Sequence, residues 1–162
     1  MRPRPSQKLA VVLEREVVHN QWESHQWRLL AVIPDVGGAP RTLVETPDRL
    51  HLVFPGFEVF LHDDEAHGYF LNVTTDKPGV FVSIRMDEET GRAYPFQSTL
   101  SYNEAARWMD GSELVEHAPA WPELVDWMAA WVDANYKPEE PRNKRFGARS
   151  FKGKGRLREE ES

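Results

Sequence analysis

The segment from His62 to His67 holds two imidazoles and three carboxylates within six residues. Imidazole nitrogens and carboxylate oxygens are ligands for zinc and other divalent ions. The weak candidates for such a site are His62, Asp64 and His67. Histidines five residues apart match no standard zinc spacing, however, and a polar run between two strand-like segments is ordinary hairpin-loop composition. We therefore favour a loop here and predict no metal site.

Other candidate catalytic groups lack the partners that catalysis needs. A general base requires a positioned proton and an orienting neighbour, and the sequence supplies neither for any further histidine. Those histidines are His19, His25, His51 and His117. Ser24-His25 with Asp48 lacks the strained Gly-x-Ser-x-Gly elbow of a nucleophile, and the sequence has no phosphate-binding glycine loop. The chain has no cysteine, which excludes thiolate nucleophiles. We predict no catalytic residue and no cofactor.

The C-terminal part of the chain differs from the rest in charge. Residues 1–136 hold 11 Lys and Arg against 21 Asp and Glu, whereas residues 137–162 hold nine against five. Residues 142–158 are basic, glycine-containing and free of acidic residues, a composition that predicts disorder. Such a tail suits solvent, the chain's own acidic body, a partner protein or nucleic acid, although an acidic body disfavours nucleic acid. The predicted partner contacts are Arg142, Lys144, Arg145, Phe146, Arg149, Phe151, Lys152, Lys154 and Arg156.

Aromatic side chains are the other candidate binding groups. Eight of them could line the mouth of a small barrel: Trp22, Trp27, Phe54, Phe57, Phe60, Tyr69, Phe81 and Phe96. In a domain of this size most of them must pack in the core, because each buries a large apolar area. Near the C-terminus, Trp127 and Trp131 belong to a segment that is apolar around much of its helical circumference. We expect one of them to face a partner.

The elements that position these residues begin with strands. Short β-rich runs separated by turn residues predict antiparallel sheet over residues 9–100. The expected strands are residues 9–18, 27–33, 41–45, 50–61, 69–74, 80–86 and 94–100. Pro55-Gly56 predicts a bulge in the fourth strand. Pro78-Gly79 predicts a β-turn between the fifth and sixth strands, so that the last three form a meander.

Two helices are expected after residue 100. Ser101 followed by Glu104 is a capping-box pattern, and Gly111 stands where a left-handed C-terminal residue belongs, which together predict a helix over residues 102–110. The second begins near Pro122, which suits the first helical position. Apolar residues then recur at helical spacing, so this helix should close the barrel or cover the sheet.

The whole chain predicts one α+β domain, since 162 residues hold a single core. We expect an antiparallel β meander or small partly open barrel with two C-terminal helices and a disordered basic tail. The predicted organisation is a flexible arm at 1–7, a β-rich domain at 8–136 and the tail at 137–162. Neither a secretory signal nor an apolar span of roughly 20 residues is visible, so we expect a cytoplasmic protein.

Several stretches of the chain resemble one bacterial family. They are Val11-Val12-Leu13-Glu14-Arg15 with Trp22-x-Ser24-His25-x-Trp27, Leu61-His62-x-Asp64-Glu65-Ala66-x-Gly68-Tyr69, Pro78-x-Val80-Phe81-Val82-x-Ile84-Arg85, and Tyr136-Lys137-Pro138-Glu139. This pattern resembles the family catalogued as domain of unknown function 3305. The resemblance implies an accessory role in assembly, because members are commonly encoded beside molybdenum-dependent formate dehydrogenases and their maturation proteins. It implies no catalytic residue.

We therefore expect a non-enzymatic accessory or assembly protein that docks on a partner enzyme, with a molybdenum-dependent formate dehydrogenase system as the partner that the resemblance implies. Two alternatives remain open. One is a nucleic-acid-binding module that uses the basic tail. The other is a small-ligand or metal-binding β-barrel that uses His62 and His67.

Overall fold

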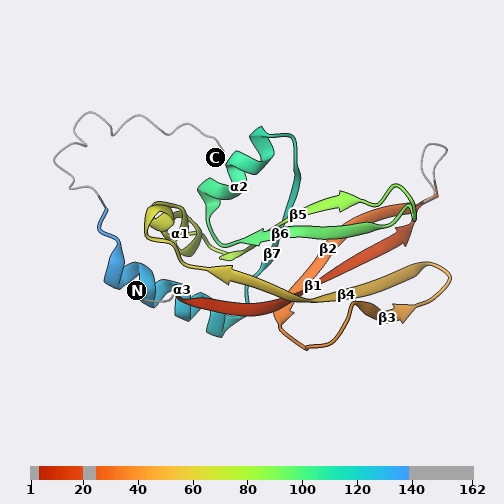
Figure 1. Ribbon diagram of the computed structural model, residues 1–162, viewed down its shortest axis with the longest axis horizontal. Helices are drawn as coiled ribbons and strands as arrows, with labels where there is room; N and C mark the ends of the chain where they lie inside the picture. Colours follow the sequence, from red (N-terminus) through yellow and green to blue (C-terminus); the bar gives the residue numbers. More distant parts are fainter. Residues whose placement is uncertain (1–3, 20–24, 139–162) are drawn as a thin grey trace.

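The computed structural model describes residues 4–19 and 25–138, which form two antiparallel sheets and three α-helices (Figure 1). In chain order the elements are β1 (Ser6–Val17), β2 (His25–Pro34), β3 (Arg41–Glu45), β4 (Arg49–Phe60), α1 (Ala66–Val73), β5 (Gly79–Met86), β6 (Ala93–Thr99), α2 (Tyr102–Asp110), β7 (Leu114–Pro119) and α3 (Pro122–Asn135). A 3-10 turn, Asp63–Glu65, precedes α1. The predicted α+β class with antiparallel pairing is confirmed.

The first sheet has the strand order β2-β1-β4-β3. The bulge predicted at Pro55-Gly56 is confirmed, because Leu9 of β1 pairs with Phe57 and Val11 with Phe54, which leaves an extra residue in β4. Gly56 has a φ of +88°, a backbone conformation that favours glycine. The bulge lies at the point where β4 passes from the middle of the sheet toward its helical end.

The second sheet has the order β6-β5-β7. Its inner face, which includes Val82 and Ile84, packs on the first sheet, and its outer face is covered by α2. Ser83 on that outer face is fully buried, and the ring of Phe81 contacts the ring of Tyr102 of α2 edge to face. Strand β7 was not predicted, since its sequence has neither clear alternation nor a β-branched run.

The strand predicted at residues 69–74 is wrong, because residues 69–73 belong to α1 and Thr74 caps its C-terminal end. Tertiary contacts outweigh the β-rich composition here. Gly68 lies so close to the start of α2 that an added Cβ would sit 2.0 Å from Ser101 Oγ. The buried Asn72 amide donates hydrogen bonds to the carbonyls of Gly79 (2.8 Å) and Leu100 (2.9 Å). The predicted meander is therefore a two-strand hairpin, and Pro78-Gly79 leads from α1 into β5.

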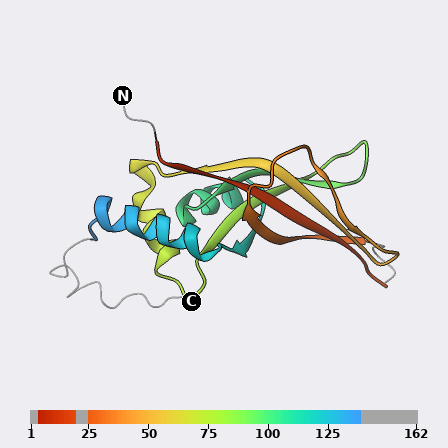
Figure 2. The same ribbon diagram turned by 90° about the horizontal axis from the view of Figure 1, so that it is seen from below.

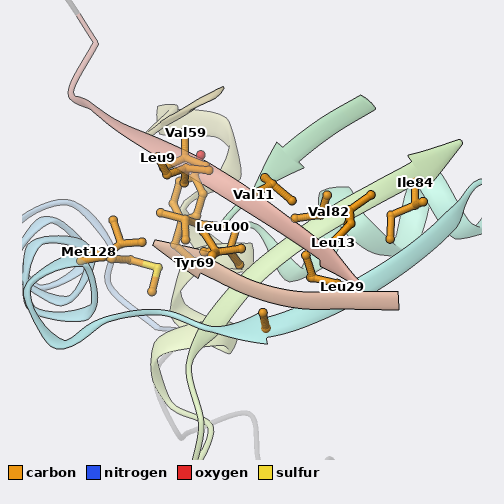
Figure 3. Close-up of a cluster of buried hydrophobic side chains, with 14 of the residues drawn as sticks. Leu9, Val11, Leu13, Leu29, Val59, Tyr69, Val82, Ile84, Leu100 and Met128 are labelled. Atoms are coloured by element: carbon orange, nitrogen blue, oxygen red, sulfur yellow. The ribbon is translucent and has the colours of Figure 1, made fainter. Parts of the chain in front are cut away.

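The core lies between the two sheets and continues under the helices. Leu9, Val11 and Val82 meet there, and Met128 of α3 joins them from the helical end (Figure 3). Figure 2 shows α1 and α3 together at one end of the strands. α3 covers this end with Leu124, Met128 and Val132, as its apolar spacing predicted. No helix among the described residues is long and apolar enough to cross a membrane.

The two sheets meet along two seams, β2 beside β7 and β4 beside β6. In the described residues neither seam carries a β-ladder, so the predicted partly open barrel is a pair of open sheets. The first seam is bridged by Glu116 of β7, whose carboxylate accepts a hydrogen bond from the Leu29 backbone N–H at 2.8 Å. The β4–β6 seam contains the candidate site.

The ends of α2 confirm one predicted cap and correct the other. Ser101 Oγ accepts a hydrogen bond from the Glu104 N–H at 3.0 Å, as the capping box predicted. Gly111 was predicted to be left-handed, which is wrong: its φ is −87°, and Ser112 takes the left-handed conformation at φ +72°. The turn closes one residue later than expected, because the Ser112 N–H bonds to the Met109 carbonyl.

Candidate functional site

An aromatic groove of about 370 Å³ lies between β4 and β6 and is bordered by α2. We call it the β4–β6 groove; it is lined by residues 56–58, 60, 62, 96–99, 104 and 108. Phe60 from β4 and Phe96 from β6 are 39% and 40% exposed. Phe57 and the indole of Trp108 are half-buried beside them. Large aromatic side chains so exposed on neighbouring elements form a surface suited to binding.

Two unpaired strand edges border this groove. β3 pairs with β4 only over residues 50–53 of β4, so in the described structure the stretch after the Gly56 bulge has β1 as its single strand neighbour. β6 likewise pairs only with β5. On an antiparallel edge, alternate N–H and C=O groups point away from the sheet. Two groups of the β4 edge are already used, since the Phe60 carbonyl accepts a hydrogen bond from the Tyr69 hydroxyl and the Gly56 N–H donates one to Asp35. The groove therefore combines aromatic side chains with strand edges whose remaining backbone groups can pair with an extended chain.

The charged side chains in the groove wall are two carboxylates, Glu58 and Glu104, and the wall contains no Lys or Arg. Each carboxylate is held by a hydroxyl. Ser6 Oγ donates to Glu58 at 2.6 Å, and Thr99 Oγ1 donates to Glu104 at 2.6 Å. The groove is thus an acidic and aromatic surface, with His62 as its remaining titratable group.

Carboxylates near the groove also affect the pKa of the Tyr69 phenol. Burial raises the pKa of Tyr69 to about 12; its hydrogen bond with the His62 backbone opposes this rise, and the carboxylates of Glu104, Glu65 and Asp64 add to it. Three carboxylates therefore act on one buried phenol directly behind the groove.

Ser98 adds a polar group to the groove wall. Its Oγ is buried and has no hydrogen-bond partner among the described residues. A buried hydroxyl without a partner is unfavourable, and such groups are uncommon in folded proteins.

Phe96 is fixed from behind by a cation. It is the extra residue of a second bulge, because Ser83 pairs with Gln97 while Ile84 pairs with Pro95. The guanidinium of Arg85 lies 3.4 Å from the Phe96 ring centroid and forms an ion pair with Glu113 at 2.5 Å. That hydrogen-bonded pair lowers the pKa of Glu113. The contact with Arg85 therefore restricts the motion of the Phe96 ring, which reduces the side-chain entropy that would be lost when a partner binds.

Two further cavities lie along the same side of the molecule. One, of about 320 Å³, lies where β3 and β4 face the β5–β6 hairpin and is lined by Arg41, Phe54 and Tyr94 among others. The other, of about 540 Å³, lies at the end of α3 and includes Trp131 and Asn135. This second cavity shares His62 with the groove. The groove and the cavity at the end of α3 therefore border each other at His62.

The candidate metal ligands His62, Asp64 and His67 are not brought together. Among residues 4–19 and 25–138, no three His, Asp or Glu side chains are close enough to hold an ion. His62 lies beside the ring of Phe60, whereas His67 Nδ1 is 3.0 Å from the Asn103 amide nitrogen. The segment is also not the hairpin loop that we predicted, since it forms the 3-10 turn and the start of α1.

The other candidate histidines have ordinary surroundings. His51 contacts Glu14, and His117 lies against the ring of Phe81, where burial lowers the pKa of His117. Ser24 of the rejected triad lies outside the described residues. The structure therefore adds no catalytic role to these groups.

The tryptophans of α3 contact the core. Trp127 and Trp131 are half-buried and pack against the main hydrophobic cluster. The ring of Trp131 meets Tyr69 edge to face at 5.5 Å and also lines the cavity at the end of α3. A partner contact through these residues stays a prediction. The tail residues predicted as partner contacts, from Arg142 to Arg156, lie outside the described residues.

The eight aromatics considered for a barrel mouth divide into three groups. Phe57, Phe60 and Phe96 line the groove, and Phe54 lines the cavity beside it. Tyr69 is fully buried, whereas Trp27 and Phe81 are half-buried. Trp22 lies outside the described residues. The sequence thus supplied the groove aromatics as candidates but not the pairing that leaves them exposed.

Sequence reasoning missed a charged cluster on the first sheet. Glu14 of β1 is 2% exposed and accepts hydrogen bonds from Arg28 at 2.7 Å and Arg49 at 2.8 Å, with His51 Nε2 also at 2.8 Å. Burial alone would raise the pKa of Glu14, but the hydrogen bonds from His51, Arg28 and Arg49 outweigh it and lower the pKa to about 2. A glutamate directly after the apolar run 9–13 was the available signal. Its fully partnered state indicates a structural role.

Comparison with known proteins gives a family and no assigned function. No curated protein and no solved structure matches the chain. One family model, described as "Protein of unknown function (DUF3305)", matches residues 8–145. This range contains both sheets almost entirely, the whole β4–β6 groove and all three helices. The chain belongs to the DUF3305 family of proteins of unknown function.

Proposed function

We propose that this domain is a non-catalytic accessory protein that docks on a partner protein through the β4–β6 groove. The observation that carries the proposal is the pair of aromatic side chains, Phe60 and Phe96, exposed by about two fifths beside two unpaired strand edges. Aromatic anchors in a pocket supply much of the energy of protein interfaces. Free strand edges add main-chain hydrogen bonds to an extended ligand.

The chemistry of the groove defines the kind of segment that fits it. Its wall offers Glu58 and Glu104 as anions and no cation. A partner segment with aromatic and basic side chains would therefore be bound in preference to an acidic one, because a carboxylate there would meet like charge. The segment would be extended, since strand edges pair with extended backbone.

The proposed partner is a molybdenum-dependent formate dehydrogenase or one of its maturation proteins. The support for this choice is the gene neighbourhood that the family resemblance implies. The basic tail would make a second, electrostatic contact with the same partner. We propose that binding assists assembly of the enzyme without a covalent step in this chain.

Co-purification of the tagged full-length chain with formate dehydrogenase from the native cell tests the groove. The variant Phe60→Ala/Phe96→Ala should recover at least about tenfold less enzyme, because two interface anchors are removed. The matched control is Val36→Ala/Leu43→Ala, whose side chains are 47% and 51% exposed and lie outside the groove. Equal recovery by the two variants would refute the groove as the docking surface.

The tail contact is tested separately by salt. Deletion of residues 139–162 should reduce the loss of recovery between low and high salt, since exposed charges are screened within roughly 10 Å at 0.1 M ionic strength. Recovery that does not depend on the tail at either salt concentration would remove this part of the proposal and leave the groove unaffected.

A further inference from the structure

The described chain ends beside the β4–β6 groove. After α3, Tyr136 packs against the ring of Phe70 at 5.0 Å, which holds the end of α3 against α1 (Figure 1). Asn135 lines the cavity at the end of α3 together with His62, and His62 also lines the groove. The residues after Pro138 therefore leave the domain next to the surface to which we assign partner binding.

We propose that the chain's own C-terminal segment, residues 142–152, occupies the β4–β6 groove in cis when no partner is bound. This inference rests on the proposed function only in using the same groove. The partner's segment and the tail would compete for one surface, and binding of the partner would release the basic tail to make its electrostatic contact.

The tail is long enough to reach. Twenty-four residues follow Pro138, and an extended chain spans about 3.4 Å per residue, so the segment could extend up to about 80 Å. The groove begins at His62, which belongs to the same cavity wall as Asn135. Only the residues nearest Pro138 are needed as a connection, which leaves residues 142–152 free to enter the groove.

The chemistry of the tail is complementary to that of the groove. Residues 142–152 hold Phe146 and Phe151 among five Lys and Arg residues and no acidic residue. The groove holds exposed aromatic rings, two carboxylates and no Lys or Arg. Stacking of Phe on Phe60, Phe96 or Trp108, with cations near Glu58 and Glu104, would match the aromatic and the charged side chains of the wall. An acidic tail of the same length would be repelled.

Covalent connection makes even a weak contact sufficient. A segment joined to its site by a short flexible linker has an effective concentration on the order of 1 mM. A contact with a dissociation constant of about 1 mM between separate molecules would then be formed about half of the time. The same weakness lets a partner segment displace the tail.

A single nitroxide label on the tail tests this placement in the full-length chain. The chain has no cysteine, so Ser150→Cys introduces one attachment point. Amide signals of Phe60, Gln97 and Ser98 should lose roughly half of their intensity or more relative to the reduced label, if the tail is bound at least half of the time. Signals of Leu43 and Val44 in β3 should keep theirs. Equal losses in both regions, or no loss in either, would overturn the proposal.

Two controls separate aromatic docking from attraction by charge alone, and binding within one chain from binding to a second copy. Adding Phe146→Ser/Phe151→Ser to the labelled chain keeps every charge and should restore the groove signals; persistence of the loss would show that charge alone attracts the tail and would overturn aromatic docking. A mixture of labelled chain with isotope-enriched unlabelled chain should show no loss. A loss in that mixture would mean that the tail binds a second copy, which contradicts the cis arrangement.

The outcome is distinguishable from that of the proposed function. If the label shows no groove contact while Phe60→Ala/Phe96→Ala still loses the partner, only the tail inference fails. If the label shows the contact while these substitutions leave partner recovery unchanged, the partner-docking role of the groove fails and the tail inference stands.

Discussion

Glu14 and Glu58 lie on neighbouring strands of one sheet in opposite surroundings. Glu14 is 2% exposed and is partnered by two arginines and a histidine. Glu58 lies in the wall of the β4–β6 groove, which contains no Lys or Arg, and its hydrogen-bond donor is the neutral Ser6, while the exposed Lys8 is its register partner on β1. The first carboxylate is hydrogen-bonded to cations within the fold, whereas the second borders a groove whose wall has no cation. The comparison separates a cluster that stabilises the domain from a surface that is open to binding.

Removal of the Glu14 charge should have the largest effect on stability. Glu14→Gln is expected to lower the free energy of unfolding at pH 7 by about 3 kcal/mol, which is the worth of a pKa lowered from 4.5 to about 2 in a nearly buried group. Urea denaturation measures it. The control is Glu113→Gln, whose ion pair with Arg85 is partly exposed and screened by solvent, so this substitution should lower the free energy of unfolding much less. Equal losses of unfolding free energy in Glu14→Gln and Glu113→Gln would show that the buried Glu14 cluster does not stabilise the domain more than an exposed ion pair does.

Acid should remove the same stabilisation. The pKa of Glu14 is lower in the folded chain than its ordinary value of 4.5, so the contribution is present above pH 4.5 and is lost as the pH falls toward 2. The difference in free energy of unfolding between the native chain and Glu14→Gln should shrink over this window. A difference that stays constant from pH 6 to pH 3 would show that charge is not its origin.

The adjacent residues Phe60, in the groove, and Leu61, in the core, should differ in how much their substitution lowers the free energy of unfolding. Leu61 is 2% exposed, and Leu61→Ala should cost about 3 kcal/mol through lost burial and a cavity. Phe60 is 39% exposed, and Phe60→Ala should cost only about 1 kcal/mol while it reduces partner recovery. Chemical denaturation of both variants checks this order. A larger cost for Phe60→Ala would make Phe60 a packing residue.

The smallest effect is expected at Ser98. Because its buried Oγ has no partner in the described structure, Ser98→Ala should leave stability unchanged or raise it by up to about 1 kcal/mol. The comparison variant is Ser101→Ala, because Ser101 Oγ caps α2 and donates a hydrogen bond to Glu65. This substitution should lower the free energy of unfolding by about 1 kcal/mol or more. Thermal melting of the pair distinguishes them. A clear destabilisation by Ser98→Ala would imply that Ser98 Oγ makes a hydrogen bond, which would contradict the structure.

Local signals predicted much of this fold. The strand at residues 41–45, the helix at 102–110 and the bulge at Pro55-Gly56 match the structure, because turn residues, caps and alternation act over a few positions. Residues 69–74 failed because their conformation depends on Asn72 and Gly68 contacting segments distant in sequence. Composition alone does not encode such contacts.

The groove itself could be predicted only in part. Phe57, Phe60 and Phe96 were named as aromatics that could line an opening, but their exposure follows from where β3 stops pairing with β4 and from β6 being an edge strand. Strand order is a tertiary property that one sequence does not show. The Glu14 cluster was missed for the same reason, since Arg28 and His51 become its neighbours only through pairing of β1 with β2 and β4.

Amide hydrogen exchange of the full-length chain, alone and bound to its co-purified partner, tests whether the β4–β6 groove binds the partner. Docking there predicts that partner binding slows exchange at residues 57–60 and 96–99, on the two unpaired edges, while β3 exchanges at the same rate in both states. Protection confined to β3, or absent from both groove edges in a complex shown to be formed, would contradict the assignment of the groove as the docking surface.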